Sequence, residues 1–206
     1  MKKIFVLSFQ IIIFLSLHLT NSAQVISENQ HEGFYLRMLA GIGSAKTTME
    51  NSTYEIEFSG FSTYIRGEIG AAIADNTILF GTAGGHLLKN PDVSSGSQTV
   101  NVNNAELIYS EFGAGVTHYF MPLNAYLSLS VLGVLNRIEY GGSKGDSEIG
   151  FGFNVSIGKE WGITDDLGMG LALFYSYGKA DDQSEEVKPP TLSNNILGIA
   201  LSVTYN

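Results

Sequence analysis

Residues 167–178 read Leu-Gly-Met-Gly-Leu-Ala-Leu-Phe-Tyr-Ser-Tyr-Gly, and the two alternating sets of side chains in this stretch decide the fold. The odd-numbered positions, from Leu167 to Tyr177, are large and apolar and end in two tyrosines. The even-numbered positions are small apart from Phe174. Because successive side chains of a β-strand point to opposite faces, the stretch predicts a strand with one large apolar face and one small face.

The same alternation recurs along the chain. It is regular in residues 34–43, 149–163 and 197–205, and less regular in 61–73, 78–88, 108–120 and 127–140. We interpret the loss of alternation within Leu127–Tyr140 as a bulge. The glycines of Ile78–Leu88 leave the facing of that strand open.

The connections between these segments alternate in length. Tight turns are expected at Ala74–Thr77, Met121–Asn124 and Thr164–Asp166, and long polar loops at Ala45–Glu57, Lys89–Asn104, Gly141–Glu148 and Ala180–Asn195. Outer-membrane barrels have short periplasmic turns and long extracellular loops. Residues 33–206 therefore predict an all-β fold, an eight-stranded antiparallel up-and-down transmembrane β-barrel with both chain ends in the periplasm.

The first residues predict an export signal. Lys2 and Lys3 precede an apolar run, and small residues follow it, so we expect a signal peptide over residues 1–23 with cleavage after Ser22 or Ala23. A membrane anchor is the rival interpretation, but the run is interrupted by polar residues and is short for a spanning helix. Residues 24–32 would then form a periplasmic lead-in.

Composition excludes several classes of protein. The chain carries 20 acidic against 11 basic residues, and removal of a signal peptide would make the balance more acidic still, which argues against a nucleic-acid partner. There is no cysteine, so neither a disulfide nor a lipid attached through cysteine holds the protein in its compartment. Glycine is frequent, at 24 of 206 residues, as a small strand face requires.

The small face decides between a soluble and a membrane barrel. A soluble barrel, such as a lipocalin, would place many charged residues on its outer face. Here the non-apolar face is mainly glycine, alanine and serine, which suits the narrow interior of an eight-stranded barrel. The large apolar face is then directed at outer-membrane lipid.

Charged residues within the strands also lie on the small face. We predict a lumenal ion-pair cluster of Arg37, Arg66, Glu68 and Glu111, ringed by Tyr35, Tyr64, Tyr109 and Tyr119. A basic residue facing lipid at the midplane would cost roughly 2–4 kcal/mol, whereas inside the barrel it can pair. We interpret the cluster mainly as a packing network that plugs the barrel. The alternative interpretation is a gated ion path or a small-molecule site.

Aromatic residues near strand ends predict interfacial girdles. The candidates are Tyr119, Phe120, Tyr126, Trp161, Tyr177 and Tyr205.

Several motifs resemble those of a group of small, largely uncharacterised outer-membrane β-barrel proteins. They are 33–37 (GFYLR), 117–128 (THYFMPLNAYLS), 158–161 (GKEW) and 203–206 (VTYN). The general build is similar to the OmpA transmembrane domain and OmpX. The resemblance implies the outer membrane of a Gram-negative cell and recognition by the barrel-insertion machinery, although the usual terminal aromatic residue is here the penultimate Tyr205, followed by Asn206.

The sequence predicts no catalytic site, cofactor or metal site. Barrel enzymes such as lipid A deacylases and palmitoyl transferases need a nucleophile with a histidine base. After residue 23 the histidines are His31, His86 and His118, and His86 is the one candidate worth testing. Asp181, Asp182, Glu185 and Glu186 lack an EF-hand spacing and are expected to form a solvated acidic loop.

The leading functional hypothesis is a structural or surface-interaction protein that meets an extracellular protein or other surface partner through its long loops. Ala45–Glu57 is expected to extend as a hairpin whose second arm, Tyr54–Phe58, offers an edge for strand pairing. A narrow channel for small molecules is the alternative. A lipid-modifying barrel enzyme is the third and least favoured hypothesis.

Overall fold

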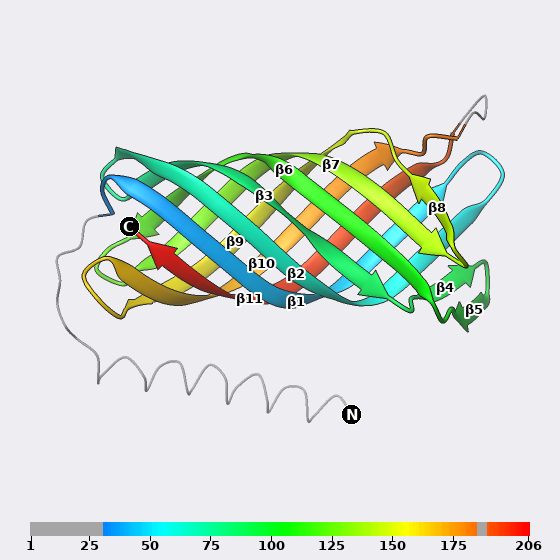
Figure 1. Cartoon of the computed structure of the whole chain (residues 1–206), viewed down its shortest axis with the longest axis horizontal. Helices are drawn as coiled ribbons and strands as arrows, with labels where there is room; N and C mark the ends of the chain where they lie inside the picture. The colour runs from blue at the N-terminus through cyan, green and yellow to red at the C-terminus, as the bar shows by residue number, and fades with distance from the viewer. Residues whose placement is uncertain (1–30, 185–188) are drawn as a thin grey trace.

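The structure, a computed structural model, describes residues 31–184 and 189–206, so the predicted signal peptide lies outside the described residues (Figure 1). Within these residues eight long strands form a closed antiparallel barrel, which confirms the predicted fold. They are β1 (Phe34–Glu50), β2 (Glu55–Ala74), β3 (Thr77–Lys89), β6 (Ala105–Phe120), β7 (Ala125–Tyr140), β9 (Gly150–Gly162), β10 (Leu167–Asp181) and β11 (Thr191–Tyr205). Pairing of β1 with β11 closes the barrel. None of the described residues forms a helix long and apolar enough to cross a membrane.

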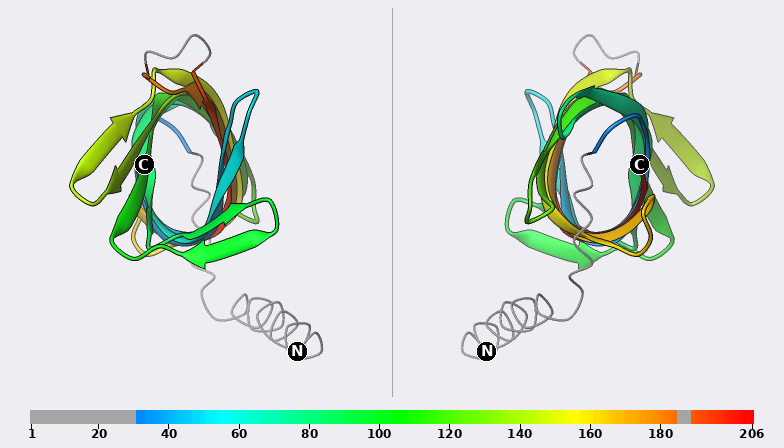
Figure 2. Two further views of the ribbon diagram at one scale, coloured as in Figure 1. Left: turned by 90° about the vertical axis from the view of Figure 1, so that its right-hand side faces the viewer. Right: turned by 90° about the vertical axis from the view of Figure 1, so that its left-hand side faces the viewer.

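Three short strands lie at the end of the barrel opposite the C-terminus (Figure 1). The strands β4 (Asp92–Ser95) and β5 (Gln98–Asn101) form a hairpin that pairs with β2, and β8 (Ser143–Asp146) pairs with β7. Figure 2 shows these hairpins projecting outward from the barrel rim. The segments predicted as long loops are thus largely β-structure. The hairpin expected over Ala45–Glu57 does form, since the β1–β2 ladder continues to the pair Glu50 and Glu55, and its second arm begins at Glu55 instead of Tyr54.

The register of the strands sets their tilt. A path from Leu36 to its partner Ile69, and then from partner to partner around the barrel, returns to β1 at Lys46. The return point lies ten residues beyond the start, which is a shear of about 10 for eight strands. Such a shear requires strongly tilted strands and a narrow interior.

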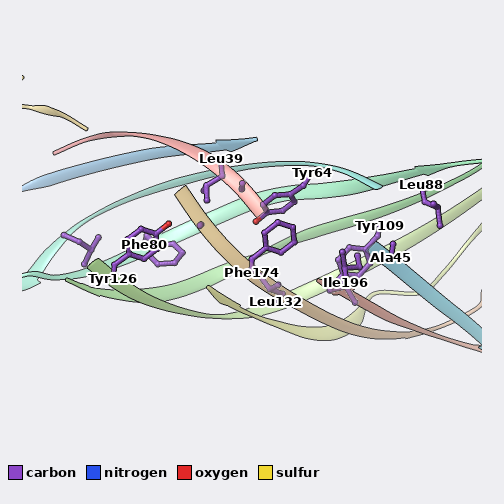
Figure 3. Packing of buried hydrophobic residues seen from close by; sticks show 14 of the residues in the cluster. Leu39, Ala45, Tyr64, Phe80, Leu88, Tyr109, Tyr126, Leu132, Phe174 and Ile196 are labelled. Atoms are coloured by element: carbon purple, nitrogen blue, oxygen red, sulfur yellow. The ribbon is translucent and has the colours of Figure 1, made fainter. Parts of the chain in front are cut away.

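The two faces of each strand differ as the alternation predicts. Outward positions carry large apolar side chains, such as Ile65, which is 61% exposed, and Leu201, also 61% exposed. Inward positions are buried, and their aromatic and aliphatic side chains pack against one another across the lumen (Figure 3). Glycines leave room for these rings: a Cβ atom on Gly158 would lie 2.5 Å from the Tyr126 ring.

The structure settles the facing of β3, which the sequence left open. In β3 the inward residues are Ile78, Phe80, Thr82, His86 and Leu88, with Gly84 between them.

The predicted bulge in Leu127–Tyr140 is wrong, because β7 pairs with β6 without a register shift over its whole length. The alternation blurs there because Leu132 and Val134 are apolar residues that point into the lumen, both at most 2% exposed. A register shift occurs instead between Ala72 and Ala74 of β2.

Candidate functional site

The lumen holds two layers of buried ion pairs. The short turns at Asn76 and Asn124 lie at one end of the barrel, which in outer-membrane barrels is the periplasmic end. In the layer nearer that end, Nη2 of Arg37 lies 2.7 Å from Oε2 of Glu68, and Nε of Arg37 donates to the same oxygen. The hydroxyl of Tyr35 also donates to this oxygen, at 3.0 Å. Arg37 and Glu68 are at most 3% exposed, so both charges are compensated by protein groups.

Arg66 forms the second layer and connects it to the first. Its Nε lies 3.3 Å from Oε1 of Glu68, and its Nη1 lies 3.3 Å from Oε1 of Glu111. The same guanidinium donates to the hydroxyls of Thr82 and Ser130, each at 2.7 Å. The four residues predicted as a cluster, Arg37, Arg66, Glu68 and Glu111, are therefore one connected network.

Glu160 is a further member that the sequence analysis did not include. It is 2% exposed, lies 3.7 Å from Nη1 of Arg37, and accepts hydrogen bonds from Thr204 and Tyr119. Its position on the small face was the available signal.

Tyr126 was predicted to lie in an interfacial girdle and does not. It is 0% exposed, and its ring faces the Arg37 guanidinium, with 4.4 Å between Cζ and the ring centroid. Tyr119 is likewise inside, at 1% exposed. Tyrosine is amphipathic and suits either location, so the alternation, which places both residues on the inward face, is the better guide.

The other predicted girdle residues face outward. Phe120 is 50% exposed and Tyr205 is 47% exposed, and Phe34 lies beside Tyr205 with ring centroids 6.3 Å apart. Trp161 and Tyr177 occupy outward positions on β9 and β10. Lys159, an exception on the apolar face, lies over the Trp161 ring at 5.8 Å.

His86, the residue singled out for enzymatic activity, lies in an aromatic layer above the ion pairs. It is 3% exposed and stacks on Tyr64, with centroids 4.5 Å apart, and Tyr64 contacts Phe174 at 4.3 Å. Tyr109 covers it from another side. Within the described residues no hydrogen-bond partner reaches either ring nitrogen of His86, so the imidazole functions here as a packed ring.

A chain of amides lies above His86 at the extracellular mouth. Thr47 donates to Oδ1 of Asn194, and Nδ2 of Asn194 donates to Oδ1 of Asn136, each at 2.8 Å. Leu88 and Ile196 flank this chain and are nearly fully buried. The side chains of this hydrogen-bonded chain and its two apolar neighbours therefore narrow the extracellular mouth of the lumen.

The periplasmic mouth is closed by His31, which is 6% exposed. Its backbone N–H donates to Oδ1 of Asn76, and its Nε2 lies 2.8 Å from Oδ1 of Asn124. Its Nδ1 contacts the amide of Asn206. Asn76 and Asn124 lie in tight turns with positive φ values of 57° and 50°, a conformation that asparagine tolerates better than most residues. We call the contacts of His31 with Asn76, Asn124, Asn206 and Tyr119 the periplasmic seal.

Charged, aromatic and amide layers succeed one another along the lumen, and their side chains are held by mutual contacts. Among residues 31–184 and 189–206, no group of three histidines or acidic residues is placed to hold a metal ion. Glu185 and Glu186 of the predicted acidic loop lie outside the described residues.

Comparison with known proteins identifies the fold. No family model matches the sequence, and no curated protein matches it. Among solved structures, the outer membrane protein AlkL in lipid bilayers is similar with a TM-score of 0.54 and 12% identity, over 90% of this chain and 96% of that one. OprG of Pseudomonas aeruginosa is similar with a TM-score of 0.53 and 12% identity, over 85% and 98%. This chain has the fold of small outer-membrane β-barrels.

The apolar outer surface agrees with that fold, because a closed barrel whose exterior is lined with exposed isoleucine, leucine and phenylalanine belongs in a bilayer. The similar structures also include the outer membrane protease OmpT of Escherichia coli, with a TM-score of 0.50 and 7% identity over 87% and 99% of the two chains. A barrel of similar fold can thus be an enzyme, and the fold alone assigns no activity to this one.

Proposed function

We propose that this protein is a plugged outer-membrane anchor that presents its extracellular hairpins to a protein or surface partner. The observation that carries the proposal is the buried Arg37–Glu68–Arg66–Glu111 network, whose members are at most 3% exposed. Truncation of one member of such a network leaves an uncompensated buried charge. The network therefore favours a fixed plug over an open path.

The hairpins supply the surface for interaction. The β1–β2 ladder extends to Glu50 and Glu55, and β4 continues the same sheet by pairing with β2 through Glu57, Phe58 and Ser59. β5 forms the edge of this extension, and all four of its residues are exposed. An exposed strand edge offers backbone donors and acceptors to a partner strand.

Two measurements test the proposal. The first is planar-bilayer recording of the purified protein, where a plugged lumen predicts no discrete conductance. Steady single-channel steps from the intact protein would instead support the alternative of a narrow channel.

The second measurement concerns the β4–β5 hairpin. Residues 91–103 are replaced by a short turn, and cells displaying either form are compared for adherence to a protein-coated surface. We expect heat-modifiable migration, which reports an intact barrel, to be unchanged and adherence to fall. Equal adherence of the two forms would contradict the role of the hairpin.

A further inference from the structure

Four basic residues occupy equivalent positions on the four strands that run toward the extracellular side. They are Lys46 of β1, Lys89 of β3, Arg137 of β7 and Lys179 of β10, and we call them the basic belt. All four are exposed and lie on the outward face of their strands.

Three of the four belt residues directly follow an apolar residue of the outer surface, and Lys46 follows one outward position later. The preceding outward residues are Leu87 before Lys89, Leu135 before Arg137 and Tyr177 before Lys179. On β1 the apolar residue Ile42 comes first, then Ser44 and then Lys46. The belt thus marks the extracellular edge of the lipid-facing band.

The register shows that the belt residues lie at nearly one height along the barrel axis. From β1 through β2 and onward, each step from a residue to its register partner rises toward the extracellular end. With a shear of about 10 over eight strands, this rise is about 1.25 residues per strand crossed. Lys89 pairs with Glu106 and Glu106 with Glu139. The residue of β7 at the height of Lys89 therefore lies about 2.5 residues before Glu139, next to Arg137.

The other neighbours in the belt agree with this calculation. Lys46 pairs with Asn195 and Asn195 with Tyr177, and the offset in the opposite sense leads to Lys179. On the other side, Lys46 pairs with Ser59 and Ser59 with Asp92, which leads to Lys89. All four residues lie within about two residues of a common height.

Three of the four belt residues form ion pairs whose basic side chains stay exposed to solvent. Lys46 lies 2.5 Å from Glu57, Lys89 lies 2.8 Å from Glu106, and Arg137 lies 2.6 Å from Asp146. The three basic side chains are 53%, 58% and 47% exposed. Exposed ion pairs contribute little to stability, so another anion can replace the carboxylate at small cost.

We propose that the basic belt binds the phosphate groups of lipids in the surrounding outer leaflet. A ring of cations at the edge of the apolar band meets lipid headgroups where they leave the hydrocarbon, and phosphate is the anion that basic side chains bind strongly there. The belt encircles the barrel, whereas a protein partner would contact one side. The partner that fits is therefore a shell of phosphorylated lipids, independent of any partner of the hairpins.

The test uses the purified protein in phosphatidylcholine bicelles to which diphosphoryl lipid A, or the same lipid without phosphates, is added in rising amounts. The readout is the rise of the thermal unfolding midpoint relative to each variant in phosphatidylcholine alone. This internal reference separates lipid binding from any change in the intrinsic stability of a variant. We expect diphosphoryl lipid A to raise the midpoint and added salt to reduce the rise.

Charge-matched variants locate the effect. The double variant Lys46→Gln, Lys89→Gln is expected to lose about half of the rise, because two of four belt charges are removed. The control variant Lys144→Gln, Lys159→Gln removes the same charge from a hairpin strand and from the periplasmic half, and should keep the rise. The variant Lys46→Arg, Lys89→Arg should also keep it.

Three outcomes would overturn the proposal. They are an unchanged rise in the belt variant, an equal loss in the control variant, and an equal rise with the phosphate-free lipid, which would assign the effect to acyl chains.

Discussion

The imidazole ring of His31 stacks on the phenol ring of Tyr119, with centroids 3.6 Å apart and planes 15° from parallel. The hydroxyl of Tyr119 donates to Glu160, which in turn lies near Arg37. The periplasmic seal is thereby coupled to the buried ion pairs. The segment before β1 is therefore part of the barrel's packing at its periplasmic end.

Removal of the His31 ring should destabilise the barrel. We expect His31→Ala to lower the free energy of unfolding by about 1–3 kcal/mol, because the partly buried amide groups of Asn124 and Asn206 lose their partner. Urea unfolding in lipid vesicles measures this. The neighbouring exposed residue provides the control, Glu32→Ala, which should change stability little. Equal effects of the two substitutions would show that the seal contributes nothing specific.

The seal should weaken in acid. Burial lowers the pKa of His31 below its ordinary value of 6.5, against smaller raising contributions from Asn124 and Glu160. The folded state therefore binds the proton less readily than the unfolded state, and the stabilisation is complete above about pH 6.5 and is lost as the pH falls below it. The difference in the free energy of unfolding between the wild type and His31→Ala should therefore become smaller as the pH is lowered from 8 to 5. A constant difference would refute this coupling.

Glu68 should be the most sensitive carboxylate of the lumen, since it contacts both Arg37 and Arg66. Glu68→Gln leaves two buried guanidiniums short of a counter-charge and should lower the free energy of unfolding by about 3–5 kcal/mol. Glu139→Gln breaks the exposed pair with Lys144, which has an N–O distance of 2.9 Å, and should cost less than about 1 kcal/mol. Comparable losses in the two variants, measured by urea unfolding, would argue against a tightly compensated network.

The small inward face should tolerate little added volume. Gly158→Ala places a methyl group against the Tyr126 ring and should destabilise by about 1–3 kcal/mol through overpacking. Gly145→Ala, where nothing lies within 4 Å of the added atom, is the matched control. Heat-modifiable migration and the yield of refolded protein provide the readout. Equal yields would mean that the Tyr126 ring moves aside freely.

The alternation of the sequence was sufficient to predict which residues point outward in strands where one face has large side chains and the other has small ones. β10 is the clearest case, with Leu171 and Leu173 outside and Ala172 inside. It was insufficient where the lumen itself is apolar, as at Leu132 and Val134, because both faces are then large.

The lumenal cluster was predictable in part. Arg37, Arg66, Glu68 and Glu111 stand out as charges within strands, whereas the role of His31 depends on a contact with residue 206 across the whole chain. Such a contact has no local signature. The short strands β4 and β8 could not be predicted, because their polar residues follow no apolar alternation and the strands form through backbone pairing.

The periplasmic seal also has a meaning for the order of assembly. Its members come from the segment before β1, from the turns at Asn76 and Asn124, from Tyr119 of β6, and from Asn206, which directly follows β11. These groups meet only after β11 has joined β1, so the seal cannot form on a partly inserted barrel. A buried His31 therefore serves as a signature of completed closure, and accessibility of that single side chain to a chemical probe would time the final step of insertion.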